Sequence, residues 1–281
     1  MSEGPVFLLV MSLLIPTIAM LGAGLLAGFA AGLFGIGGGF VVVPALFSVL
    51  HLLGGDVASH PHVAIGTSLA TIVFTSIRSV QAHARKGAVD FEILRTWAPW
   101  IVLGVAGGVL LANVVDGRAL AMTFAVGVFL MSLHFLFPVL AGRQISDQMP
   151  RGITRASVAG GLGTLSSLLG IGGGTIAVIV MTMCGRSIHR AIATAAGFGF
   201  IIAVPGAIGF ALIGRGENDL PLGSIGYVNL IAVVAISVTS MLTAPLGASA
   251  AHALPPALLK RAFAIYLMVV AGLMFRDALQ L

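Results

Sequence analysis

Apolar residues dominate the chain in long runs that short polar segments separate. The runs cover 6–34, 40–53, 63–82, 96–115, 119–140, 156–170, 174–184, 191–213, 222–251 and 262–275. A helix needs about 20 apolar residues to cross the bilayer, so most of these runs predict membrane-spanning helices. The short runs 156–170 and 174–184 favour two arms of a hairpin that turns back inside the membrane. The pattern predicts an all-α integral membrane protein with about eight to ten membrane segments.

Composition supports this class and excludes others. Hydrophobic types make up 58% of the 281 residues and charged types 8%, whereas soluble domains carry about 25% charged residues. Soluble enzymes are therefore excluded, and nucleic-acid binders too, because the cations are dispersed in short loops. The single cysteine, Cys184, excludes internal disulfides and cysteine-based metal sites. We expect no cofactor and no metal, and as partners the lipid bilayer and a small solute.

The distribution of the cations predicts an orientation. Four loops hold 10 of the 14 Lys and Arg residues: Arg85, Lys86 and Arg95; Arg143, Arg151 and Arg155; Arg186 and Arg190; Lys260 and Arg261. If successive runs cross the membrane in alternating directions, all four loops lie on one side, and the positive-inside tendency assigns that side to the cytoplasm. We therefore expect a multi-pass protein of the cell membrane (the inner membrane in a Gram-negative cell) with both termini outside. The opening residues lack a basic region and cleavage site, so we take them as mature sequence.

Two halves of the chain resemble each other. LFGIGGG at 33–39 returns as LLGIGGG at 168–174, HVAIGTS at 62–68 as HRAIATA at 189–195, and Gly108 as Gly247, at offsets of 135, 127 and 139. We infer a first transmembrane repeat over 1–140, a cytoplasmic connecting loop over 141–155 and a second repeat over 156–281. Each half holds an odd number of segments, so the second copy is expected in inverted topology. Inverted repeats with interrupted helices are typical of secondary transporters.

The two GIGGG runs predict interrupted or re-entrant helices. Consecutive glycines disfavour helix, and irregular backbone at membrane depth must be buried in protein or line a cavity. Helices restarting near Phe40 and Thr175 would offer free N–H groups and the positive end of a helix dipole, which bind anions without a charged side chain. The alternative is that the glycines only allow close helix packing. The candidate site residues are Gly35, Gly37, Gly38, Gly39, Gly170, Gly172, Gly173 and Gly174.

The chain resembles the TauE/SafE family of sulfite and organosulfonate exporters. The resemblance rests on GFAAGLFGIGGGFVVVP at 28–44, HVAIGTSLATIVFTS at 62–76, RKGAVDF at 85–91 and the second LLGIGGG. It covers nearly the whole chain and implies the transport, usually outward, of sulfite, organosulfonates or related sulfur-containing or carboxylate anions. The second repeat departs from the first, with Ala193 and Ala195 in place of Gly66 and Ser68. Equal contact of both halves with the substrate is therefore not implied.

Further polar residues within the apolar runs are candidates for function. Thr67, Ser68 and Thr194 could donate hydroxyls to a sulfonate or bond to their own helix. Arg78 could contact an anion in an inner vestibule or snorkel to the interface. His62 and His189 begin equivalent helices and could gate or carry protons, or simply lie at the interface.

No Asp or Glu falls inside an apolar run, which argues against a carboxylate proton relay. Export of a singly charged anion from a negative interior gains about 2.3 kcal/mol per 100 mV, so a facilitator needs no other coupling. The sequence therefore favours a secondary transporter of small anions, with an anion site near the membrane midplane formed by the two glycine-rich helix breaks. An anion channel stays open as an alternative. An intramembrane enzyme is disfavoured, since its nearest candidates, Ser249 and His252, share one helix end.

Overall fold

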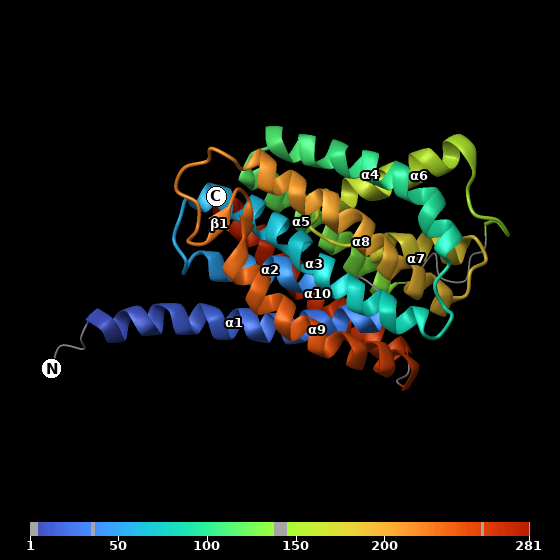
Figure 1. Ribbon diagram of the computed structural model, residues 1–281, viewed down its shortest axis with the longest axis horizontal. Coiled ribbons are helices and arrows are strands. Elements are labelled where there is room, and N and C mark those ends of the chain that lie inside the picture. Colours follow the sequence, from blue (N-terminus) through green and yellow to red (C-terminus); the bar gives the residue numbers. More distant parts are fainter. Residues whose placement is uncertain (1–4, 35–36, 138–144, 254–255, 281) are drawn as a thin grey trace.

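The protein is almost entirely helical. The computed structural model describes residues 5–34, 37–137, 145–253 and 256–280. Within these ranges it contains ten α-helices, a short 3₁₀ turn (Val57–Ser59) and one strand hairpin (Figure 1). The helices are α1 (Pro5–Phe34), α2 (Gly39–Leu50), α3 (His60–Ala84), α4 (Phe91–Val114), α5 (Gly117–Leu136), α6 (Gly152–Leu168), α7 (Gly174–Met183), α8 (Ile188–Ile213), α9 (Leu230–Ala253) and α10 (Pro256–Gln280).

Length and composition divide these helices into two groups. In the described part of the chain, seven are long and apolar enough to cross a membrane: α1, α3, α4, α5, α8, α9 and α10. The apolar helices α2 and α7 are shorter, with 12 and 10 residues, and α6 has 17. This confirms the predicted all-α membrane class. The inverted topology and the re-entrant course of the short helices stay predictions.

The apolar run 222–251 does not start as a helix, contrary to the prediction. Its first residues form an antiparallel hairpin, β1 (Ser224–Ile225) with β2 (Val228–Asn229), and helix begins only at Leu230. Gly223 and Gly226 adopt positive φ, which turns the chain here. The hairpin cannot be distinguished from the helix by hydropathy, because its residues are mostly apolar.

The main helix pairs cross between the two halves of the sequence. Helix α1 packs along α9, α4 along α6, α3 against α8, and α5 against α10. In Figure 1 the α1–α9 pair lies along one side of the molecule and the α4–α6 pair along the opposite side, with α3 and α8 between them. Each half therefore completes its packing on the other.

Small residues let the crossing pairs approach closely, as is common between membrane helices. A methyl carbon added to Gly32 of α1 would lie 2.7 Å from the Ala248 nitrogen of α9. The same addition to Gly108 of α4 would lie 2.7 Å from the Thr164 carbonyl oxygen of α6, and Gly247 of α9 meets the Phe29 carbonyl of α1 in the same manner. The last two contacts are repeat equivalents of each other. Gly247 lies 139 positions after Gly108, and Thr164 lies 135 positions after Phe29. The division into 1–140, 141–155 and 156–281 stays a prediction.

The loops between helices gather at two ends of the molecule. The connections α3–α4 and α7–α8, the end of α9 and the start of α6 lie at one end in Figure 1, on the right. These are the segments that carry most of the cations. The β1–β2 hairpin, the start of α1 and the end of α10 lie toward the other end. The basic loops thus share one end, and its assignment to the cytoplasm stays a prediction.

Candidate functional site

Both glycine runs interrupt a helix and start a new one. Helix α2 begins after Gly38 (φ 81°) and α7 after Gly173 (φ 65°), and neither cap residue offers a side chain to the first turn. The left-handed backbone at both caps is available mainly to glycine. The first amides of each helix have no partner within their own helix. The helices therefore begin within one residue of Phe40 and Thr175, where the sequence predicted them, and no side chain caps their first turns.

The two breaks lie against each other. A methyl carbon added to Gly37 would lie 3.4 Å from the Gly172 Cα, and one added to Gly39 would lie 2.9 Å from the Ile171 Cα. Ile72 of α3 touches both sides, at 3.1 Å from the methyl position on Gly37 and 3.3 Å from that on Gly172. The structure thus brings the glycines of the two runs together; Gly35 lies outside the described residues. Close packing is one role of these glycines.

Ser68 links α3 to the second break. Its hydroxyl donates to the Gly170 carbonyl oxygen at 2.8 Å, and the Ser68 side chain is fully buried. Gly170 itself has φ 60° and packs on Ile65 of α3 and Val43 of α2. Of the hydroxyl residues singled out in the sequence, Ser68 is the one whose bond reaches a glycine run.

Thr67 and Thr194 each bond to the residue that caps the N-terminus of a helix. The Thr67 hydroxyl oxygen accepts the Asn229 N–H at 2.8 Å, and the Thr194 hydroxyl oxygen accepts the Asp90 N–H at 2.9 Å. Asn229 and Asp90, again 139 positions apart, cap α9 and α4 through bonds from the Ala232 and Ile93 amides. The sequence analysis did not predict this pairing. An Asn or Asp residue precedes each of the two helices at the repeat offset of 139, and this pattern could have indicated it. A substrate contact by either threonine stays a prediction.

The two repeat-related histidines differ in their surroundings. His62 is buried, with Nε2 3.0 Å from the Ala112 carbonyl oxygen and its ring stacked on Tyr227 at 4.8 Å between centroids. His189 is exposed. Burial, together with the nearby charge of Glu217, raises the pKa of Tyr227 to about 12, so this phenol stays neutral. Neither histidine lies in the contacts between the glycine runs, and gating or proton transfer by them stays a prediction.

Arg78 is exposed on α3, whereas Ser76 and Ser79 on the same helix are buried. The structure therefore does not place this arginine among the buried residues near the breaks. Among the described residues, the buried polar side chains belong to Ser, Thr, His and Asn, and none to Lys, Arg, Asp or Glu. The same residues contain no group of three His, Cys, Asp or Glu that could hold a metal ion. The polar groups around the breaks are thus neutral donors and acceptors.

Three buried hydroxyls near the second break were missed in the sequence: Ser76, Ser166 and Thr175. Each looks ordinary in a small-residue membrane helix. Comparison of the two repeats could have found them, because Ser166 and Thr175 align with Ala31 and Phe40 at offset 135.

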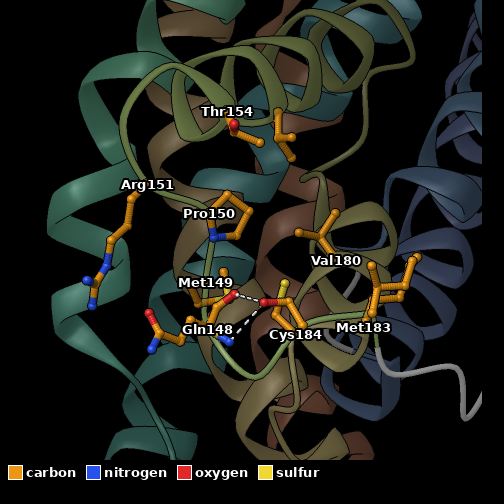
Figure 2. A pocket seen from close by; sticks show the side chains of 11 residues that line it. Gln148, Met149, Pro150, Arg151, Thr154, Val180, Met183 and Cys184 are labelled. Carbon is orange, nitrogen blue, oxygen red and sulfur yellow. Dashed lines mark hydrogen bonds between the residues drawn. The ribbon is translucent and has the colours of Figure 1, made fainter.

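A cavity of about 450 Å³ lies at the end with the basic loops (Figure 2). It lies between the segment 145–151, the start of α6 and the end of α7, and Met149, Val180, Met183 and Cys184 line it. Figure 2 shows the Arg151 side chain directed away from the group around Cys184. Val180, the α7 residue of the lining that lies nearest to the second break along the chain, is six residues after Gly174, about 9 Å along the helix. It is therefore distinct from the glycine site.

Comparisons with known proteins agree with the fold. A family model described as "Sulfite exporter TauE/SafE" matches residues 20–274. A "Probable membrane transporter protein" of Haemophilus influenzae is 38% identical over 254 residues, which cover 90% of this chain and 95% of that protein. Proteins with similar descriptions in Methanocaldococcus jannaschii and Bacillus subtilis are 27% and 28% identical, over 84% and 89% of this chain and 85% and 96% of their own lengths. No solved structure matches. The chain belongs to the TauE/SafE family of membrane transporters.

Proposed function

We propose that the protein is a secondary transporter, a facilitator or exporter, of small anions such as sulfite, organosulfonates or related sulfur-containing or carboxylate anions. The observation that carries the proposal is the contact between the two breaks, where Gly37 meets Gly172 and Gly39 meets Ile171. Two helices start at this contact with uncapped first turns. Their free amides and dipoles favour an anion at that place.

The neutral surroundings of the breaks suit transport better than tight binding. A buried cation would hold an anion strongly, whereas amides and hydroxyls stabilise it while still allowing release. Among the described residues no charged side chain is buried. Export of an anion could then draw on the membrane potential, about 2.3 kcal/mol per 100 mV for one charge.

Counterflow in liposomes tests this proposal. Vesicles preloaded with unlabelled sulfite or methanesulfonate should accumulate the labelled anion, with saturable kinetics, when they contain the protein. A panel of sulfite, sulfoacetate, taurine-like and carboxylate anions would identify the substrate class. Flux no higher than in empty vesicles for the whole panel would refute transport, and flux that rises without saturation would favour a channel.

Arg78 offers a separate test of the path. Because its side chain is exposed on α3, we expect Arg78→Ala to change the apparent KM for the transported anion less than about twofold, as for a snorkelling side chain. Initial rates at varied anion concentration give the KM. A severalfold rise in KM with normal amounts of inserted protein would instead place Arg78 in the anion path.

A further inference from the structure

Three buried hydroxyls from three helices surround the second break. They belong to Ser76 of α3, Ser166 of α6 and Thr175 of α7, whose exposed fractions are 2%, 0% and 4%. None of the three has a hydrogen-bond partner in the described part of the chain. Most buried hydroxyls are paired, because an unpaired one loses its bonds to water without replacement. Three at one break therefore indicate a ligand that would complete them.

The geometry directs two of these hydroxyls at the break itself. A methyl carbon added to Gly173 would lie 2.8 Å from Ser166 Oγ. A methyl carbon added to Gly199 would lie 2.5 Å from Ser76 Oγ and 3.6 Å from the Gly172 carbonyl oxygen, so both atoms lie close to the same position on this glycine. Thr175 follows Gly174 in the uncapped first turn of α7. Ser166, Ser76 and the first turn of α7 thus each lie next to residues of the second break.

At the first break, the positions equivalent to these three residues carry no hydroxyl. The repeat equivalents of Ser166 and Thr175 are Ala31 and Phe40, and the equivalent of Ser76 at offset 127 is Ala203. Phe40 is fully buried and its ring meets that of Phe263 edge-on, 6.4 Å between centroids. The three unpartnered hydroxyls of the second break are therefore not repeated at the equivalent positions of the first.

We propose, on the basis of the proposed transport function, that the second break supplies the side chains that bind the charged head of the substrate. Ser76, Ser166 and Thr175 donate one hydrogen bond each to an oxyanion with one charge and three equivalent oxygens, a sulfonate or a related sulfur oxyanion. Three donors match three oxygens, whereas a carboxylate offers two. A dianion such as sulfate would bring a second charge that no buried cation in the described residues compensates.

The atoms that a ligand must displace at Gly173 are side-chain ends and not backbone. The atoms nearest to the methyl position on Gly173 include Ile202 Cδ1 at 2.5 Å and Leu162 Cδ2 at 3.0 Å. Both are the ends of rotatable side chains, which change rotamer at little cost compared with backbone movement. The substrate head can reach the hydroxyls when these two ends turn away.

Matched variants of Thr175 and Ser166 test the proposal. Binding is measured from the rise in melting temperature of the detergent-solubilised protein with methanesulfonate, which reports affinity without transport. We expect Thr175→Val and Ser166→Ala to weaken methanesulfonate binding by roughly ten- to a hundredfold, as for lost hydrogen bonds to a charged group. Thr175→Ser keeps the hydroxyl and should stay within about threefold. Ser132→Ala removes an equally buried hydroxyl that bonds to Ala264 of α10, and should leave the affinity unchanged.

The outcomes separate this site from the transport function. Unchanged methanesulfonate affinity in Thr175→Val and Ser166→Ala, with melting temperatures near wild type without ligand, would overturn the hydroxyl site while wild-type flux still supported transport. If the wild type binds methanesulfonate but transports no anion, the transport function is refuted and the hydroxyl site still stands. Acetate or sulfate binding as tightly as methanesulfonate would overturn the assignment to a singly charged, three-oxygen head.

Discussion

Valine in place of Gly39 is expected to abolish anion flux while the protein remains inserted in the membrane. The first carbon of the new side chain would meet the Gly170 carbonyl and lie 2.9 Å from the Ile171 Cα, both backbone atoms. Backbone cannot turn away as a side-chain end can, so the two breaks must separate. Displacement of a site by about 1 Å can cost a hundredfold in rate, and we expect at least that loss of initial rate in liposomes.

Gly161→Val is the matched control for this prediction. Gly161 lies in α6, the helix that leads into the second break, yet a methyl group there meets nothing within 4 Å. Flux should stay close to wild type. Comparable losses in both variants would mean that valine harms these helices generally, and normal flux in Gly39→Val would show that contact between the breaks is not needed for transport.

Alanine in place of Asn229 is expected to lower stability more than the loss of any exposed helix cap. Asn229 is fully buried; its Oδ1 accepts the Ala232 N–H at 3.0 Å, and its Nδ2 donates to the Leu222 carbonyl at 2.8 Å and to Ser224 Oγ at 3.2 Å. The variant loses a cap and leaves buried groups unpaired, a loss of roughly 2–4 kcal/mol. The melting temperature should fall by about 5–15 °C.

Asp116→Ala provides the comparison for Asn229→Ala. Asp116 caps α5 by accepting the Ala119 N–H at 2.7 Å, and its side chain is exposed, so its removal should cost only about 1 kcal/mol. Thermal unfolding of the two purified variants under identical detergent conditions gives the difference. Equal melting temperatures would show that the hairpin bonds of Asn229 contribute nothing beyond an ordinary cap.

Apolar run length predicted each of the ten helices, because membrane helices must be apolar over their whole length. The starts of α4 and α5 fall earlier than the runs, since the polar caps Asp90 and Asp116 precede them. The hairpin at Ser224–Asn229 was missed because its residues are mostly apolar, and the positive φ of Gly223 and Gly226 that turns the chain is not visible in the sequence. Hydropathy thus locates the helices but does not resolve short turns within an apolar stretch.

The candidate site was predictable only in part. The glycine runs are visible as a repeated motif, and their contact follows from the repeat. Thr67 and Thr194 bond to Asn229 and Asp90, which lie 162 and 104 residues away along the chain, and no local pattern shows such a partner. Exposure likewise separates Arg78 from Ser76, two residues away on the same helix. Partners and burial depend on tertiary packing, which a single sequence does not display.

The pairing of α1 with α9 sets an order of events during biogenesis. Helix α1 leaves the ribosome first, but α9 starts only at Leu230, about 10–40 s later at 5–20 residues per second. Until then the face of α1 that carries Gly24, Gly28 and Gly32 has no α9 backbone to cover it. Helix α1 must therefore remain in the bilayer or beside the insertion machinery until α9 has been synthesised. A polypeptide truncated before α9 would leave this glycine face without its partner helix.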